Sequence, residues 1–201
     1  MSRYFLLTLN LFFLMQTLEV QAASEDIAAY TNFIRGSNKY DETLNLGEEV
    51  NEDENRKRAF DRQLEAAEQG SAEDQNNIGV MYAKGTHITL NINKALEWFL
   101  KAAKQESAQA QYNIGVLYIK GIGIPRDINQ AIEWYLKAAE QGNSMAQFNL
   151  GSLYSNGKEV AQDHVKAHEW YLKSAEQGYA DAQFSLGFMY DHAQGVSQDI
   201  E

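Results

Sequence analysis

Two histidines in the chain have the spacing of metal ligands. His164 and His168 are four residues apart, which places two imidazoles on one face of a helix, where they could share a metal ion. No H-E-x-x-H follows, because the required position holds Leu172, and the sequence offers no evident third ligand. The chain also lacks cysteine, which excludes thiolate ligands, thiolate catalysis and disulfides. We therefore expect neither a metal site nor a cofactor.

A serine and a lysine have the spacing of a catalytic pair. Ser155 and Lys158 match the S-x-x-K of serine enzymes that act on β-lactams. That chemistry needs the serine at the start of a helix, whereas Gly157 stands where a helix should end. The Gly-x-Gly at residues 121–123 lies in an expected loop between helices and follows no strand, so it does not predict a phosphate site. A hydrolase of cell-wall material or β-lactams stays as the alternative to a non-enzymatic protein.

The charge of the chain argues against a nucleic-acid partner. Of the net charge of −11, residues 23–55 carry the larger part, with nine acids against two bases. Residues 56–201 hold 18 acids and 14 bases. Neither segment offers the basic stripe that a phosphate backbone requires, so no nucleic acid is expected.

The N-terminus has the pattern of a secretory signal peptide. Arg3 precedes an apolar run over residues 5–15, and small residues stand at −3 and −1 of a cleavage site after Ala22. The run is too short to cross about 30 Å of hydrocarbon, and Asn10 interrupts it. We predict that residues 1–22 are removed, which leaves a periplasmic or secreted protein without stable membrane insertion.

A set of side chains recurs every 36 residues. A fixed period of this size is typical of a solenoid, in which each unit buries its apolar face only against its neighbours. The recurring residues are Gln75, Gln111, Gln147 and Gln183; Ile78, Ile114, Leu150 and Leu186; Gly79, Gly115, Gly151 and Gly187; Tyr82, Tyr118, Tyr154 and Tyr190; and Trp98, Trp134 and Trp170. Because proline occurs once and Ala, Leu, Glu, Gln and Lys are frequent, the repeated unit is predicted to be all-α.

Each repeat is predicted to contain two helices. The first helices are expected near 72–84, 108–120 and 144–156, and the second near 92–104, 128–140 and 164–176. Asn91, Asp127 and Asp163 stand where an N-cap side chain would precede each second helix. A glycine inside a helix costs about 1 kcal/mol relative to alanine, so its return on the packed face predicts a close approach of the second helix. We expect the repeated tryptophan to be its large partner.

The two ends of the array are expected to differ from its middle. Residues 23–56 are predicted to be an acidic segment with a short capping helix over 24–36, and residues 57–201 to be the solenoid. Asp199 stands at the cap position of a fourth second helix, and the sequence stops at Glu201, so we expect the last repeat to be incomplete. Its first helix would then lack a partner. Either the sequence is a fragment of a longer array, or another molecule covers that face. Self-association of two chains through the incomplete repeat is one such case.

The repeated residues resemble the Sel-1-like repeat family, a relative of the tetratricopeptide repeats. Its pattern A-x-A-Q-x-N-L-G-x-x-Y-x-x-G, followed by K-A-x-x-W-Y-x-K-A-A-x-Q-G, is nearly intact at residues 108–115 and 131–142. The resemblance covers about residues 57–201. It implies a right-handed superhelix of antiparallel helix pairs that serves as a scaffold for protein or peptide binding. In bacteria such proteins are often exported and act in the envelope or in host contact.

A second stripe of the first helices, here called the groove stripe, is expected to line the concave side. It consists of Glu73, Asn77, Val80 and Lys84; Gln109, Asn113, Val116 and Lys120; Met145, Asn149, Ser152 and Asn156; and Asp181, Ser185, Phe188 and His192. The candidate ligand-binding residues among them are Asn77, Asn113, Asn149, Glu73, Lys84, Gln109, Lys120 and Met145.

The asparagines of the groove stripe recur while most of its other positions vary. An amide carries donors and an acceptor, which suits a peptide backbone or a carboxylate, and related tetratricopeptide repeats use an asparagine in this way. The alternative is that these amides bond to neighbouring parts of the repeat. The sequence favours a non-enzymatic protein- or peptide-binding scaffold of the bacterial envelope or secreted fraction. The hydrolase above and a host-directed secreted effector are the alternatives.

Overall fold

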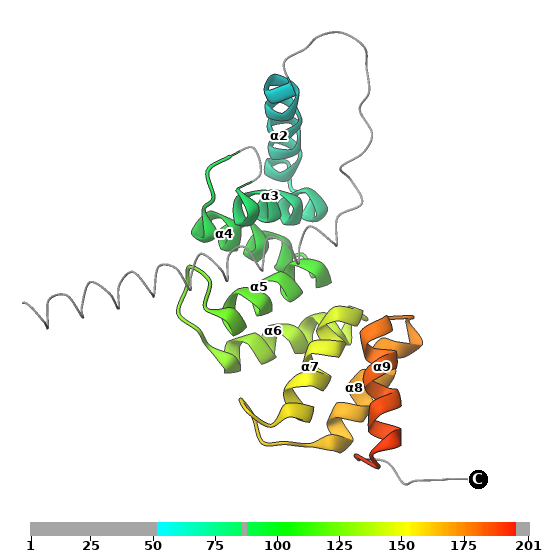
Figure 1. Cartoon of the computed structure of the whole chain (residues 1–201). Helices are drawn as coiled ribbons and strands as arrows, with labels where there is room; N and C mark the ends of the chain where they lie inside the picture. The colour runs from blue at the N-terminus through cyan, green and yellow to red at the C-terminus, as the bar shows by residue number, and fades with distance from the viewer. Residues whose placement is uncertain (1–51, 86–87, 196–201) are drawn as a thin grey trace, which may run out of the picture.

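The computed structural model describes residues 52–85 and 88–195, which form eight α-helices and no strands (Figure 1). The helices are α2 (Glu52–Glu68), α3 (Ala72–Lys84), α4 (Ile92–Ala103), α5 (Ala108–Lys120), α6 (Ile128–Glu140), α7 (Ser144–Asn156), α8 (His164–Glu176) and α9 (Ala180–Asp191). The predicted all-α repeat fold is confirmed. The signal peptide at residues 1–22 and the helix expected over 24–36 lie outside the described residues.

The helices stack in chain order into one curved array, from α2 at one end to α9 at the other (Figure 1). Within each repeat the two helices pack as a hairpin, α3 with α4, α5 with α6 and α7 with α8. Each second helix also packs against the first helix of the next repeat. At the N-terminal end α2 covers α3, and it contains residues on both sides of the boundary expected at residue 56. None of the helices that the structure describes is long and apolar enough to cross a membrane.

The second helices begin at the caps that the sequence predicts. Asn91, Asp127 and Asp163 each accept a hydrogen bond at Oδ1 from the backbone N–H three residues later, at 3.0 Å. This bond satisfies one of the amides that a helix leaves free at its start. Such bonds to a carboxylate favour its charged form, and accordingly the pKa of Asp163 lies below its usual value, mainly because of the backbone N–H of Lys166.

The helical glycines face the aromatic residue that follows the tryptophan, so the expected tryptophan partner was wrong. A Cβ built on Gly115 would lie 2.6 Å from carbons of the Tyr135 ring, and the other two full repeats show the same closeness. Successive residues of a helix point about 100° apart, so Tyr135 faces α5 and Trp134 points elsewhere. The Trp134 ring is half-buried, and the Nζ of Lys137 lies over it in a cation–π contact, 4.3 Å from the ring centroid.

A buried glutamine in the first helices α3 and α7 joins each of them to two neighbouring helices. The Nε2 of Gln147 donates to the carbonyl oxygen of Ala139 in α6 at 3.0 Å. Its Oε1 accepts from the Nε2 of Gln177, just after α8, at 2.7 Å. Gln75 makes the equivalent pair of bonds with Ala67 and Gln105. Because a buried amide must be hydrogen-bonded, this geometry accounts for the return of glutamine at the same register in the three full repeats, where it is buried.

Candidate functional site

The groove stripe is closed at some positions and open at others. Val80, Asn113 and Val116 are buried, whereas Glu73, Lys120 and Asn156 are exposed. The remaining stripe residues of α3, α5 and α7 are half-buried. The solvent exposure of the groove stripe therefore varies from one position to the next.

At the junction of the first and second repeats, an asparagine of the stripe is used within the fold. The Nδ2 of Asn113 donates to the Oδ1 of Asn76 at 2.9 Å, and the Asn113 side chain is 3% exposed. Its own Oδ1 accepts from the Nε2 of Gln109 at 3.4 Å. The bond to Asn76 links α5 to α3, and the bond from Gln109 lies within α5. Of the two roles that the sequence left open for Asn113, this geometry favours the structural one.

At the next junction the arrangement changes, because a larger residue stands at the register of Asn76. That residue is Tyr112, and the asparagine of the third repeat, Asn149, instead hydrogen-bonds to the hydroxyl of Tyr135. Burial raises the pKa of Tyr135 far above its usual value, and the bond from Asn149 opposes that rise. Tyr135 therefore stays a neutral phenol near neutral pH.

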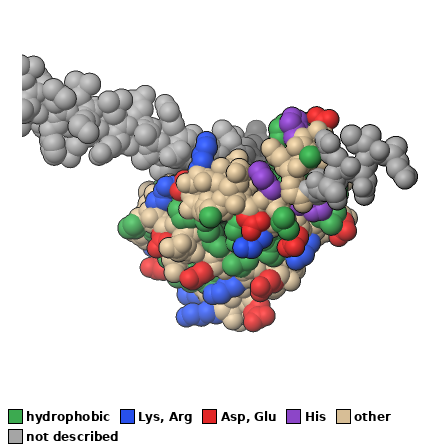
Figure 2. Space-filling view, turned by 90° about the horizontal axis from the view of Figure 1, so that it is seen from below, with side chains coloured by type: hydrophobic (Ala, Val, Ile, Leu, Met, Phe, Trp, Pro, Cys, Tyr) green, Lys and Arg blue, Asp and Glu red, His purple; other side chains and the backbone are tan. Residues whose placement is uncertain are grey.

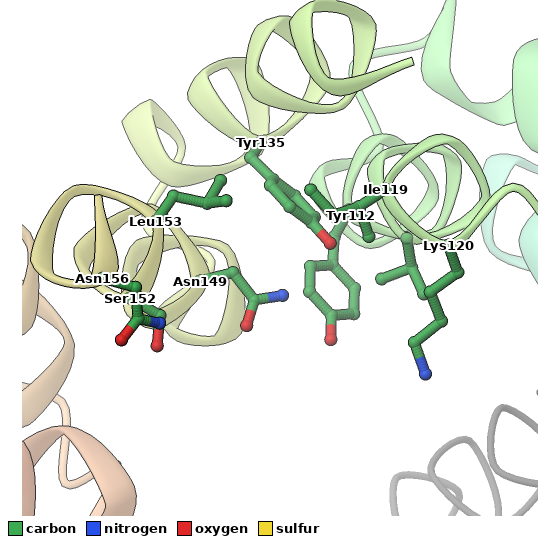
Figure 3. Close-up of a pocket in the computed structure, with 9 residues that line it drawn as sticks. Tyr112, Ile119, Lys120, Tyr135, Asn149, Ser152, Leu153 and Asn156 are labelled. Atoms are coloured by element: carbon green, nitrogen blue, oxygen red, sulfur yellow. The ribbon is translucent and has the colours of Figure 1, made fainter. Parts of the chain in front are cut away.

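A pocket of about 250 Å³ opens at this second junction, between α5, α6 and α7 (Figure 3). It is lined by Tyr112, Val116, Ile119, Lys120, Tyr135, Asn149, Ser152, Leu153 and Asn156. Figure 3 shows Tyr135 reaching from α6 between the two first helices, with Asn149 on one side and the Tyr112 ring on the other. The lining is mostly apolar, and its polar groups come chiefly from α7.

The pocket brings together part of the predicted site. Lys120 and Asn149 line it, together with three further residues of the groove stripe: Val116, Ser152 and Asn156. Glu73, Asn77, Lys84, Gln109, Asn113 and Met145 are not among its lining residues. The sequence missed the two tyrosines, because the aromatic positions looked like core. The signal that could have found Tyr112 is its departure from the small residue at the same register one repeat earlier.

The serine and lysine that suggested hydrolase chemistry do not form a catalytic pair. Ser155 lies in the last turn of α7, and Gly157, with a φ of +64°, ends the helix in the left-handed conformation. The exposed Lys158 therefore follows in the loop instead of lying one helical turn beyond the serine. The carbonyl of Ser155 accepts a hydrogen bond from the Nε2 of Gln162 at 2.8 Å, which holds the loop against the helix end.

The two histidines of α8 do not gather further ligands. His168 lies against Tyr190 of α9, with its Nε2 3.0 Å from the tyrosine hydroxyl. Over residues 52–85 and 88–195, no three His, Asp or Glu side chains come together as metal ligands would.

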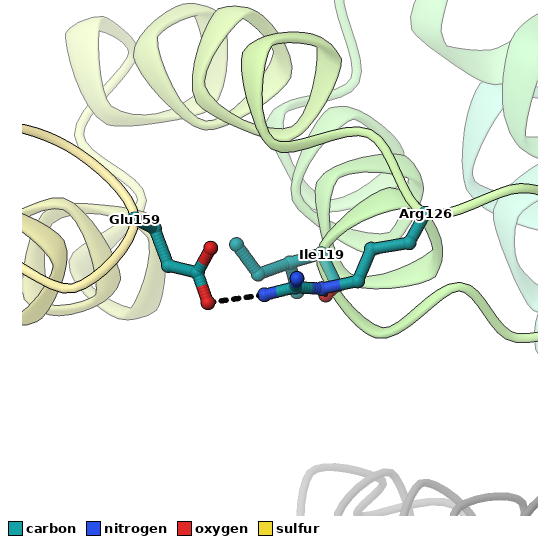
Figure 4. Close-up of polar contacts among 3 residues, drawn as sticks. All are labelled: Ile119, Arg126 and Glu159. Carbon is teal, nitrogen blue, oxygen red and sulfur yellow. Dashed lines mark hydrogen bonds and ion pairs between the residues drawn. The ribbon is translucent and has the colours of Figure 1, made fainter.

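Charged side chains of both signs are mixed over the face of the array that Figure 2 shows, without a continuous basic stripe. One ion pair joins the α5–α6 loop to the α7–α8 loop, where the Arg126 guanidinium contacts the Glu159 carboxylate (Figure 4). The Nε of Arg126 also donates to the carbonyl oxygen of Ile119 at 2.9 Å, beside the pocket. These bonds fix the loop beside the C-terminal end of α5.

The last helix has an exposed apolar face. Phe184 is 78% exposed, and Phe188 and Tyr190 are about half exposed. A Cβ built on Gly187 would meet nothing within 4 Å, unlike the equivalent glycines of the earlier repeats. The described part of the fourth repeat thus presents the surface that a second helix covers elsewhere in the array.

Comparison with known proteins identifies the repeats. The Sel1 repeat model matches residues 72–107, 108–143, 144–179 and 180–201. The protective antigen c5321 of uropathogenic Escherichia coli, which has an SLR fold, is 38% identical, with a TM-score of 0.67 over 70% of this chain and 30% of its own. A Sel1 repeat protein from Oxalobacter formigenes is 37% identical, with a TM-score of 0.68 over 72% of this chain and 59% of its own.

A more distant structure shares the fold. Helicobacter pylori cysteine-rich protein B is 21% identical, with a TM-score of 0.53 over 67% of this chain and 96% of its own. The chain spans less than two thirds of the length of the two more similar structures. No curated protein matches it. Proteins built from Sel1 repeats are in general scaffolds for protein interaction. On the family match over residues 72–201 and the stacked helical hairpins, this chain belongs to the Sel1 repeat family.

Proposed function

We propose that the protein is a non-enzymatic scaffold or adaptor that binds a protein or peptide through its groove stripe. The observation that carries the proposal is the pocket of about 250 Å³, which opens on that stripe between α5 and α7. A concave, mostly apolar site with a few polar groups is the usual form of a recognition site. The geometry around Ser155 offers no support for the hydrolase. Turnover of nitrocefin or muropeptides that is lost in Ser155→Ala would contradict a non-enzymatic role.

The proposed place of action is the periplasm or the outside of the cell. It is supported by the signal-peptide pattern of residues 1–22. Expression of the chain in a bacterium, followed by fractionation and N-terminal sequencing, tests it. The expected product begins at Ala23 and is absent from the cytoplasm, and an uncleaved cytoplasmic product would contradict this part of the proposal.

The binding surface is tested with two matched pairs of substitutions. Glu73→Lys with Asn77→Lys changes the groove stripe outside the pocket, on α3. Asn93→Lys with Glu97→Lys makes the same changes at the same spacing on α4, where both side chains are exposed. Capture of a partner by the full chain should fall in the first variant and stay unchanged in the second. Equal capture by both variants would contradict binding through the groove stripe.

Self-association through the exposed face of α9 is a second part of the proposal. Phe184 and Phe188 lie exposed beside Gly187, and contiguous exposed apolar surface is typical of an interaction site. Sedimentation velocity over a range of concentrations tests it. A dimer that is lost in Phe184→Ser supports the idea, and a monomer at every concentration would count against it.

A further inference from the structure

The pocket lies at a junction where one register position holds a tyrosine instead of the asparagine of the first repeat. The series is Asn76, Tyr112, Phe148 and Phe184, one residue for each repeat. Where this residue is asparagine, the groove-stripe asparagine of the following repeat bonds to it directly: Asn113 donates to Asn76 at 2.9 Å. Where it is Tyr112, the groove-stripe asparagine of the following repeat, Asn149, bonds to Tyr135 instead. The pocket opens beside the rings of Tyr112 and Tyr135. The pocket therefore lies at a junction whose residues differ from those of the first junction.

Its size suits one side chain. An apolar cavity of roughly 150 Å³ holds a benzene ring, whereas pockets for whole drug-sized ligands measure about 300–1,000 Å³. At about 250 Å³, this pocket has room for one large side chain and part of the backbone that carries it. It is too small to enclose a cofactor of ordinary size.

Its floor is aromatic. The Tyr112 and Tyr135 rings lie 5.8 Å apart between centroids at an angle of 30°, and both residues are 1% exposed. The half-buried Ile119 and Leu153 form apolar walls. A further ring can pack on such a pair in a tilted or edge-on geometry, with centroids about 4.5–7 Å apart.

The next junction shows that a ring at this register accommodates two aromatic neighbours. Phe148, the equivalent of Tyr112, lies 5.5 Å from the Tyr171 ring and 5.2 Å from the Tyr179 ring. In the second junction Asn143 stands at the register of Tyr179, so this position, among the described residues, supplies no third ring there.

We propose that this pocket binds one aromatic side chain of a partner polypeptide, as the anchor of the binding surface proposed above. The inference rests on that proposed function, since a partner must present the ring. The ring packs on Tyr112 and Tyr135, while the polar groups of Ser152 and Asn156 lie along the wall that α7 contributes. A buried aromatic anchor in a fitted pocket is the usual source of most of the affinity of an interface.

The test uses small probes on the full chain labelled with ¹⁵N. N-acetyl-phenylalaninamide should shift the amide resonances of Asn149, Ser152 and Leu153 saturably, with a dissociation constant on the order of millimolar. N-acetyl-glutaminamide, a polar probe of comparable length, should bind at least about tenfold more weakly. Equal shifts by both probes, or shifts elsewhere in the array, would overturn the inference.

Variants at the pocket distinguish the effect of filling its volume from the effect of removing a polar group that lines it. Ser152→Phe places a ring at a register where the fourth repeat already has Phe188, and it should abolish probe binding. Ser152→Ala removes the hydroxyl that accepts from the Tyr171 hydroxyl at 3.3 Å but leaves the pocket open, so it should retain binding. Should Ser152→Phe fail to fold, Asn156→Trp at the exposed rim covers the mouth instead and should have the same effect. Unchanged binding in a folded filling variant would overturn the inference.

The same variants distinguish failure here from failure of the proposed function. A partner that binds Ser152→Phe as well as the unmodified chain, but loses affinity in the α3 variant, refutes the aromatic anchor and leaves the groove stripe intact as a binding surface. A partner indifferent to both refutes the groove stripe itself, whatever the probes show.

Discussion

The side-chain amide of Asn113 donates to the Oδ1 of Asn76 at 2.9 Å, and this bond between residues 37 apart in the chain joins the first helices α3 and α5. Both side chains are buried, and loss of one partner would leave the other unsatisfied away from water. An unsatisfied buried polar group costs about 1–3 kcal/mol. The bond therefore contributes to the stacking of repeats and not to ligand contact.

The first prediction follows from that bond. Asn113→Ala should lower the free energy of unfolding by about 1–3 kcal/mol in urea titrations. A double-mutant cycle with Asn76→Ala should give a coupling energy of about 0.5–3 kcal/mol. Asn129→Ala, at an exposed position of α6, is the control and should change stability by less than about 0.5 kcal/mol. Additive effects of Asn113→Ala and Asn76→Ala would show that the bond does not couple the repeats.

A pair of equivalent glycines tests the close helix approach. Gly115→Ala would place a methyl group 2.6 Å from the Tyr135 ring, so it should destabilise the chain by about 1–3 kcal/mol through overpacking. Gly187→Ala meets nothing within 4 Å and should gain about 0.5–1 kcal/mol from helix propensity. Urea titration of both variants checks the difference, and effects of the same sign would contradict the packing described here.

The glutamines allow a similar comparison. Gln147→Leu removes the donor to the carbonyl of Ala139 and the acceptor for Gln177, both at a buried site, and should cost about 1–3 kcal/mol. Gln183→Leu breaks an exposed bond to the carbonyl of Ala175 and should cost less than about 0.5 kcal/mol. Thermal unfolding of the two variants side by side gives the answer. A Gln183→Leu variant as damaged as Gln147→Leu would refute the role of burial.

The buried phenol of Tyr135 predicts a loss of stability in alkali. An exposed tyrosine in the unfolded chain loses its proton near pH 10, whereas burial raises the pKa of Tyr135 in the folded chain. The unfolded state then binds fewer protons than the folded state, so stability falls as pH rises above about 10. Tyr135→Phe should remove up to about 1.4 kcal/mol of this loss per pH unit. Urea titrations at pH 9 and pH 11 measure it, and equal losses in both proteins would contradict the burial.

Much of the fold could be predicted from the sequence because its determinants lie close together and return every 36 residues. The N-cap side chains and the helix bounds are such features, and the expected first helices coincide with α3, α5 and α7. The partner of the helical glycine could not be predicted as simply. The choice between Trp134 and Tyr135 depends on a rotation of 100°, and both residues are large and aromatic.

The pocket could not be predicted from the residues that all repeats share, because it is lined in part by residues that differ between repeats. Tyr112 stands at the register of Asn76, and it lines the pocket where α5 meets α6 and α7. The repeated asparagines were equally ambiguous, since Asn113 and Asn149 share a register but bond to different partners. The 36-residue period predicts the features that all repeats share, whereas the candidate site is formed in part by residues that differ between repeats.

The most direct test of the account is photo-crosslinking from the two sides of the array. A photoreactive residue at Asn156, on the rim of the pocket, is compared with one at Asn129, exposed on α6. In cells that produce the full chain, the account predicts a discrete crosslinked partner from position 156 and none from position 129. A partner crosslinked only from position 129 would contradict binding through the groove stripe.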